Sequence, residues 1–154
     1  MGTDPALIQQ LEKVAIGLVG ITALALRESA TRPELTLLQW RALLLIGGSP
    51  EPLRIGDLAR RLPASPSSAT RVVERLSHRG LVTSLRRTVD GRGVWLEVTP
   101  TGQTEYQAVS ERRRELLREA VMPLADVERD VDGALAVLAD LMGSWPGTTS
   151  VGGR

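Results

Sequence analysis

Residues 55–82 read IGDLARRLPASPSSATRVVERLSHRGLV, and this stretch decides the fold. Its first part, 55–62, predicts a short helix that ends before a proline. A second helix is predicted from Ser65, an N-cap residue followed by proline, to Gly80, which acts as a C-terminal stop. Two short helices joined by a tight turn are typical of a helix-turn-helix.

The second of these helices has an apolar face and a polar face. At about 100° per residue, the apolar stripe consists of Ala69, Val72, Val73 and Leu76. The opposite face carries small hydroxyls near the N-terminus and cationic side chains further along: Ser67, Ser68, Arg71, Arg75 and His78. Such groups suit a helix that enters a major groove. The alternative, a solvated face without function, more commonly mixes Glu with Lys.

The pattern after Gly80 alternates with a period of two, which predicts strands at 81–86 and 94–99. The dipeptide Asp90-Gly91 lies between them and is a strong hairpin signal. The hairpin carries Arg86, Arg87 and Arg92 directly after the polar helix, so we interpret it as a DNA-binding wing, because narrow minor grooves attract inserted arginine. An exposed hairpin that uses arginine only for solubility is the alternative.

Positive charge is concentrated in the middle of the chain. Residues 54–92 contain nine arginines and only three acids, whereas the segments on both sides are net negative. The whole chain has a formal charge of only +1. A basic segment between acidic flanks is typical of a protein that binds a polyanion, although a solvated arginine-rich surface has the same composition.

Four further helices are predicted from apolar periodicity, at 5–28, 36–47, 101–122 and 125–142. The helix at 5–28 is apolar around most of its circumference and therefore needs more than one packing partner. This favours a dimerisation helix, with an ordinary core helix as the alternative. From residue 143 onward the Gly, Ser, Thr and Pro content predicts a flexible tail.

Composition argues against several classes of site. The chain has no Cys and one His, which argues against disulfides and thiolate or imidazole-rich metal sites. We find no glycine-rich phosphate loop, no paired metal ligands and no base beside a serine, so we expect neither an enzyme nor a cofactor. The absence of Phe predicts an aliphatic core, in which Trp40 takes a core position or lines a ligand pocket.

Export and membrane insertion are not expected either. The uncharged run 14–26 is shorter than the roughly 20 residues that a bilayer span needs. The acidic residues Asp4 and Glu12 precede it, which fits poorly with a signal peptide. We therefore expect a cytoplasmic protein without a membrane partner.

In the order of its elements and in its motifs the chain resembles the MarR family of bacterial transcriptional regulators. The resemblance is specific over residues 36–102, where Asp90-Gly91-Arg92 fits the family's Asp-x-Arg motif. The other matching segments are IGDLA at 55–59, SPSSATRVVERL at 65–76, RGLV at 79–82 and VTPTG at 98–102. The sequence departs from the family at Pro63, where Gly is frequent, and at Arg54, where a Ser or Thr helix cap is usual.

The resemblance implies a mainly α fold with a small β-hairpin wing. It implies four parts: an N-terminal dimerisation helix (1–34), a winged helix-turn-helix domain (35–102), C-terminal dimerisation helices (103–142) and a flexible tail (143–154). Its implied DNA contacts in the helix are Ser65, Ser67, Ser68, Thr70, Arg71 and Arg75. Its implied wing residues are Arg92 in the minor groove, Asp90 holding Arg92 by an ion pair, and Arg87 supporting it.

The function implied by the resemblance is that of a homodimeric repressor on a pseudo-palindromic operator in double-stranded DNA. Many such proteins release DNA when a small molecule, often an aromatic acid or phenol, enters the cleft between the dimer helices and the winged helix. Trp40 is a weak candidate for that cleft. A winged helix that binds another protein, with little sequence-specific DNA binding, is the alternative, and the arginine-rich segment favours DNA over it.

Overall fold

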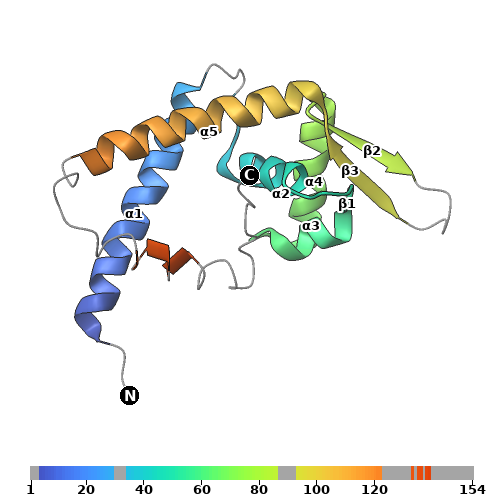
Figure 1. Cartoon of the computed structure of the whole chain (residues 1–154). Helices are drawn as coiled ribbons and strands as arrows, with labels where there is room; N and C mark the ends of the chain where they lie inside the picture. The colour runs from blue at the N-terminus through green and yellow to red at the C-terminus, as the bar shows by residue number, and fades with distance from the viewer. Residues whose placement is uncertain are drawn as a thin grey trace.

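The computed structural model describes residues 4–29, 34–86, 93–122, 133, 135–136 and 138–139. Its elements follow in the order α1 (Pro5–Glu28), α2 (Leu37–Gly47), β1 (Leu53–Arg54), α3 (Ile55–Arg61), α4 (Pro66–His78), β2 (Val82–Arg86), β3 (Val94–Val98) and α5 (Pro100–Val121). Helices α2 to α4 and the sheet form one body at the start of α5, while α1 packs against α5 further along (Figure 1). The predicted fold class, mainly helical with a small β wing, is confirmed.

The helix termini lie close to where the sequence predicts them. Thr36 and Gln39 form a capping box at the start of α2. The hydroxyl of Ser65 accepts a hydrogen bond from the backbone N–H of Ser68 at the start of α4. Gly80 follows α4 with a φ of +69°, a conformation that glycine adopts without a steric penalty. These local signals fix the length and the direction of α4.

The sheet has one strand more than the sequence analysis predicted. β1 pairs antiparallel with β3, with Leu53 opposite Leu96 and Arg54 opposite Trp95, so the strand order is β1-β3-β2. A two-residue strand shows no alternation that could be recognised in the sequence. It nevertheless anchors the foot of the wing to the start of α3.

The core is aliphatic, as the composition predicted, with Trp40 as its buried aromatic side chain among the described residues. It lies between α2, α3, α4 and the inner face of the sheet. The largest fully buried side chains are Leu43, Leu58, Leu76, Leu81, Leu96 and Val109. Val109 belongs to α5, so this core includes the helix that leads away from the winged helix.

Helix α1 is packed at its C-terminal end and exposed along the rest. Thr22, Ala25 and Leu26 are buried, and the carboxylate of Glu28 accepts a hydrogen bond from Nε of Arg112 on α5 at 2.8 Å. The pKa of the Arg112 guanidinium is raised above its ordinary value, first by its hydrogen bond to Glu28 and then by that to Glu115. This ion pair helps to hold α1 and α5 at their crossing.

The N-terminal half of α1 presents large apolar side chains to solvent. Ile16 is 74% exposed and Val14 is 56% exposed. By length and composition α1 would also be apolar enough to cross a membrane, and only 6% of its most apolar window is buried. The apolar surface of this half is therefore not covered by the described residues.

The predicted helix at 125–142 lies mostly outside the described residues. Within that range the residues that are described, 133, 135–136 and 138–139, are helical. The predicted tail at 143–154 also lies outside them. The four predicted parts of the chain stay a prediction, and α5 begins at Pro100, just before the predicted boundary at 102.

Candidate nucleic-acid interface

The polar face of α4 is exposed over its whole length. Arg71, Arg75 and His78 are all exposed, while the apolar stripe that includes Ala69 and Leu76 is buried against the core. In the described chain no ion pair engages Arg71 or Arg75. The two guanidinium groups are thus available to an external acceptor.

The hydroxyl groups at the N-terminus of α4 form a small cluster. Oγ of Ser65 lies 3.0 Å from Oγ of Ser67 and donates to Oγ of Ser68 at 2.9 Å. Ser65 and Ser67 are exposed and Ser68 is half-buried. Hydroxyl protons rotate readily, so these groups can exchange their mutual bonds for bonds to an acceptor such as a phosphate oxygen.

Thr70 has a different local role. It is exposed, and its hydroxyl donates to the backbone carbonyl of Pro66 at 3.1 Å, one turn earlier in α4. A contact from Thr70 to a phosphate oxygen would require this bond to break. The sequence pattern could not indicate that difference between Thr70 and the serines.

The structure brings the predicted helix residues together and leaves the wing residues untested. Ser65, Ser67, Ser68, Arg71 and Arg75 share one exposed surface on α4 and its N-cap. Arg87, Asp90 and Arg92 lie outside the described residues. The two strands that lead to them, β2 and β3, pair in register from Val82 opposite Val98 to Arg86 opposite Val94.

The C-terminal end of α4 is fastened to α5 by contacts that the sequence analysis missed. Nη2 of Arg79 donates to Oε2 of Glu105 at 3.0 Å. The hydroxyl of Thr99 donates to the carbonyl of Gly80 at 2.6 Å and accepts from the N–H of Gly102 at 3.0 Å. These contacts join residues distant in sequence, so periodicity carries no signal for them.

Gly102 allows α5 to approach the turn after α4 closely. A Cβ atom at this position would lie 2.0 Å from the carbonyl oxygen of Leu81 and 2.9 Å from Cγ1 of Val98. No side chain fits there without backbone movement. The start of α5, the end of α4 and the strands of the wing therefore form one close-packed joint.

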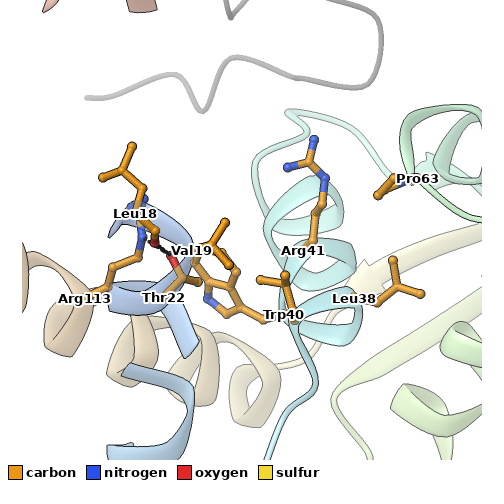
Figure 2. Close-up of a pocket in the computed structure, with 9 residues that line it drawn as sticks. Leu18, Val19, Thr22, Leu38, Trp40, Arg41, Pro63 and Arg113 are labelled. Carbon is orange, nitrogen blue, oxygen red and sulfur yellow. Dashed lines mark hydrogen bonds between the residues drawn. The ribbon is translucent and has the colours of Figure 1, made fainter. Parts of the chain in front are cut away.

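A pocket of about 590 Å³ lies between the winged helix and the crossing of α1 with α5. Figure 2 shows Thr22, Trp40 and Arg113 at one side of it, and Arg41 and Pro63 at the other. The remaining lining residues are Leu18, Val19, Leu37 and Leu38. Its volume is in the range of small-molecule sites, and its lining contains cations and apolar groups but no acid.

Two polar groups of this pocket, the indole N–H of Trp40 and the guanidinium of Arg113, are at least partly shielded from solvent. Nε1 of Trp40 is buried without a hydrogen-bond partner, and the side chain of Trp40 is only 8% exposed. The guanidinium of Arg113 lies 5.9 Å from the centre of the Trp40 ring and donates from Nε to the hydroxyl of Thr22 at 3.0 Å. Desolvation lowers the pKa of Arg113 below its ordinary value, yet arginine stays charged at neutral pH.

Comparison with known sequences finds transcriptional regulators that are similar to part of this chain. Residues 34–93 match the sequence profile of the MarR family. An HTH-type transcriptional regulator of Mycobacterium tuberculosis is 37% identical over 87 residues, which cover 56% of this chain and 59% of that relative. The chain thus spans less than two thirds of the relative's length.

Solved structures share the fold over nearly the whole chain. RV1404 from Mycobacterium tuberculosis matches with a TM-score of 0.80 at 24% identity, covering 92% of this chain and 97% of that one. FabT of Streptococcus pneumoniae, solved in complex with DNA, matches with a TM-score of 0.70 at 18% identity, covering 88% and 92%. NadR, solved in complex with 4-hydroxyphenylacetate, matches with a TM-score of 0.62 at 25% identity, covering 93% and 96%.

The matching proteins are regulators rather than enzymes. The family profile covers the elements from α2 to β2 and ends at residue 93, just before β3, so it includes α4 and its polar face. Over residues 34–93 the chain is similar in sequence to the MarR family, and over nearly its whole length it shares the fold of the solved structures.

Proposed function

We propose that this protein is a transcriptional regulator that binds a specific double-stranded DNA sequence by inserting α4 into the major groove. The observation that carries the proposal is the exposed polar face of α4, on which Arg71 and Arg75 have no partner among the described ion pairs. A guanidinium can bind the O6 and N7 atoms of guanine in bidentate fashion, and this is the commonest specific contact in the major groove.

Each predicted contact residue has a proposed role. Arg71 and Arg75 contact bases or phosphates, while Ser65, Ser67 and Ser68 donate to phosphates that flank the groove. Thr70 contributes a phosphate contact after releasing the carbonyl of Pro66. In the wing we retain the predicted roles of Arg92 in the minor groove, Asp90 as its ion-pair partner and Arg87 as support, as expectations from the sequence.

A homodimer is the second part of the proposal. The exposed apolar surface of α1, which includes Ile16 and Val19, supports pairing with the same surface of a second copy. An isologous dimer has a two-fold axis, so its two copies of α4 would meet an inverted repeat with half-sites about one helical turn apart. The operator is therefore expected to be a pseudo-palindrome.

Release by a small molecule is the third part. The pocket beside Trp40 and Arg113 combines apolar walls, a positive charge and an unpartnered indole N–H, which suits a small aromatic acid or phenol. The NadR structure contains such a molecule, 4-hydroxyphenylacetate. A ligand there would release DNA only if it binds more tightly to dimer geometries in which the two copies of α4 no longer fit successive grooves.

Repression follows if the operator overlaps a promoter, because the bound dimer would then cover it. We place the protein in the cytoplasm, where its DNA is, and assign α1 to dimerisation rather than to a membrane. The ion pair between Glu28 of α1 and Arg112 of α5 supports the assignment of α1 to dimerisation.

The proposal is tested by selecting bound duplexes from a pool of random sequence and measuring their affinity by fluorescence anisotropy at two salt concentrations. Enrichment of one inverted repeat, bound roughly 10³-fold or more tightly than scrambled DNA and weakened by salt, is the expected result. Arg71→Ala should weaken binding by about 1–3 kcal/mol, with exposed Arg118→Ala on α5 as the control.

A second candidate function is a winged helix that binds another protein. The imbalance of nine arginines against three acids over residues 54–92 favours DNA, because a concentration of positive charge suits a polyanion. If selection enriches no sequence and the wild-type protein binds all duplexes equally weakly, the DNA proposal is wrong and this alternative takes its place.

A further inference from the structure

Arg54, Gly93 and Trp95 form a platform at the foot of the wing. The guanidinium carbon of Arg54 lies 4.8 Å from the centre of the Trp95 ring, and the two residues are opposite each other in the β1–β3 pair. A Cβ atom at Gly93 would lie 3.3 Å from Nε1 of Trp95 and 3.6 Å from Nε of Arg54. The absence of a side chain at Gly93 therefore leaves room for the stacked pair.

The guanidinium of Arg54 is directed toward the loop of the wing. The Cα of Arg54 is opposite the Cα of Trp95. The Nη2 atom of Arg54, however, would lie 3.7 Å from a Cβ atom placed on Gly93, two residues before Trp95. Gly93 directly precedes β3 and follows residues 87–92, which lie outside the described part of the chain. The side chain thus runs along the hairpin rather than out into solvent at its own position.

Helix capping does not explain why residue 54 is an arginine. Arg54 is the N-cap residue of α3, but its side chain makes no capping hydrogen bond. In the described segments no carboxylate pairs with it, and the residue is exposed. Stacking on Trp95 occupies the face of the guanidinium and leaves its N–H edges available to an acceptor in the plane of the group.

We propose that Arg54, held on the ring of Trp95, binds a phosphate of the DNA backbone beside the groove that receives the wing. This inference rests on the proposed DNA-binding function. If the wing loop enters the minor groove, a residue paired with Trp95 lies about three residues behind Arg92, or roughly 10 Å along an extended strand. The minor groove is about 7.5 Å deep, so the foot of the wing lies at the level of the phosphates that border it.

The stack explains why arginine suits this position. A planar guanidinium fixed on an indole loses less side-chain freedom when it binds a phosphate than a freely rotating cation does. It contacts the backbone and not a base, so it should strengthen binding to every DNA sequence equally. Arg54 therefore differs in its expected effect from Arg71 and Arg75.

The test compares full-length Arg54→Ala with the wild-type protein by anisotropy across a series of salt concentrations. Two probes are used: the duplex selected by the wild-type protein and a duplex of mixed sequence. Each lost phosphate contact should reduce the slope of log K against log [salt] by about 0.9. A dimer that loses one contact per protomer should therefore lose about 1.8 in slope and about 60-fold in affinity at 0.1 M salt. The reduction should be equal on both probes.

Three further variants separate phosphate binding from a structural role. Arg54→Lys keeps the charge but not the planar stack, so its salt slope should stay near wild type while its affinity falls less than that of Arg54→Ala. Trp95→Leu keeps Arg54 but removes its platform, and should also lower affinity on both probes. Arg114→Ala, which removes an exposed arginine of α5, is the matched control and should change neither slope nor affinity.

The outcomes distinguish this inference from the proposed function. Unchanged affinity and slope in Arg54→Ala, with binding lost in Arg71→Ala, would overturn the phosphate contact and leave the regulator intact. If Arg54→Ala lowered the affinity but left the slope of log K against log [salt] unchanged, the phosphate contact would also be overturned. Arg54 would then act by shaping the wing. If the wild-type protein bound neither probe, both proposals would fall together.

Discussion

Arg79 and Glu105 join the C-cap residue of α4 to the second turn of α5 through a hydrogen bond of 3.0 Å between oppositely charged groups. Their side chains are only 16% and 22% exposed, so water screens this pair less than the other ion pairs of the described chain. The pair connects the C-terminal end of α4 directly to α5.

Glu105→Gln should therefore destabilise the protein. We expect a loss of about 1–3 kcal/mol in the free energy of unfolding, because the charged Arg79 would be left partly buried without its carboxylate. This loss is measured by urea denaturation, with unfolding monitored by circular dichroism. The control is Glu119→Gln, whose exposed carboxylate is 3.6 Å from Arg112 and should contribute less than about 1 kcal/mol. Equal effects of both variants would contradict this account.

Gly102→Ala should be among the most damaging single-methyl additions in the chain. The new Cβ would overlap the carbonyl oxygen of Leu81, so the start of α5 must move away from the turn after α4. We expect a loss of roughly 1–3 kcal/mol or more, measured by thermal denaturation. Gly56→Ala is the control, because no atom lies within 4 Å of its added Cβ, and it should be neutral or stabilising. If Gly102→Ala left the thermal stability unchanged, the start of α5 would not be closely packed against the turn after α4.

Ile16→Asp should convert the proposed dimer into a monomer. The side chain of Ile16 is 74% exposed on α1, and a carboxylate at a two-fold interface would bring two negative charges together in an apolar surface. Analytical ultracentrifugation at micromolar concentration measures the change, with Ile16→Leu expected to remain dimeric. A wild-type monomer at that concentration would refute the proposed role of α1.

Arg113→Met should weaken the preference of the pocket for an anion. Benzoate is expected to bind the wild-type protein more tightly than benzamide, its neutral analogue, because Arg113 is half-buried beside Trp40 and no acid lines the pocket. In Arg113→Met the preference for benzoate should fall, as isothermal titration calorimetry can measure, although Arg41 also lines the pocket. Arg114→Met is the control, and an undiminished preference for benzoate in Arg113→Met would contradict the assignment.

The sequence predicted those features that depend on neighbours along the chain. The N-cap at Ser65, the turn at Gly80 and the polar face with Arg71 are set by spacing within a few residues, and the structure confirms their placement. The aliphatic core follows in the same way from composition. The roles of these residues toward DNA remain predictions.

Features that depend on contacts between distant segments were missed. The strand Leu53–Arg54 exists because it pairs with β3, and its two residues carry no alternation of their own. The pocket is lined from α1, α2, α5 and the turn before α4, so only the folded chain could reveal it. Trp40 was interpreted as a core residue or a pocket residue, and it is both buried and part of the lining.

Each of the two described tryptophans is covered by an arginine, Trp40 by Arg113 and Trp95 by Arg54. The two indoles lie in separate places, one in the wall of the pocket and one at the foot of the wing. Emission from an indole responds to a nearby charge, so each ring is a built-in optical probe of its own arginine. With the third indole removed by Trp145→Phe, a quenching experiment could follow ligand entry and DNA contact in the same unlabelled molecule.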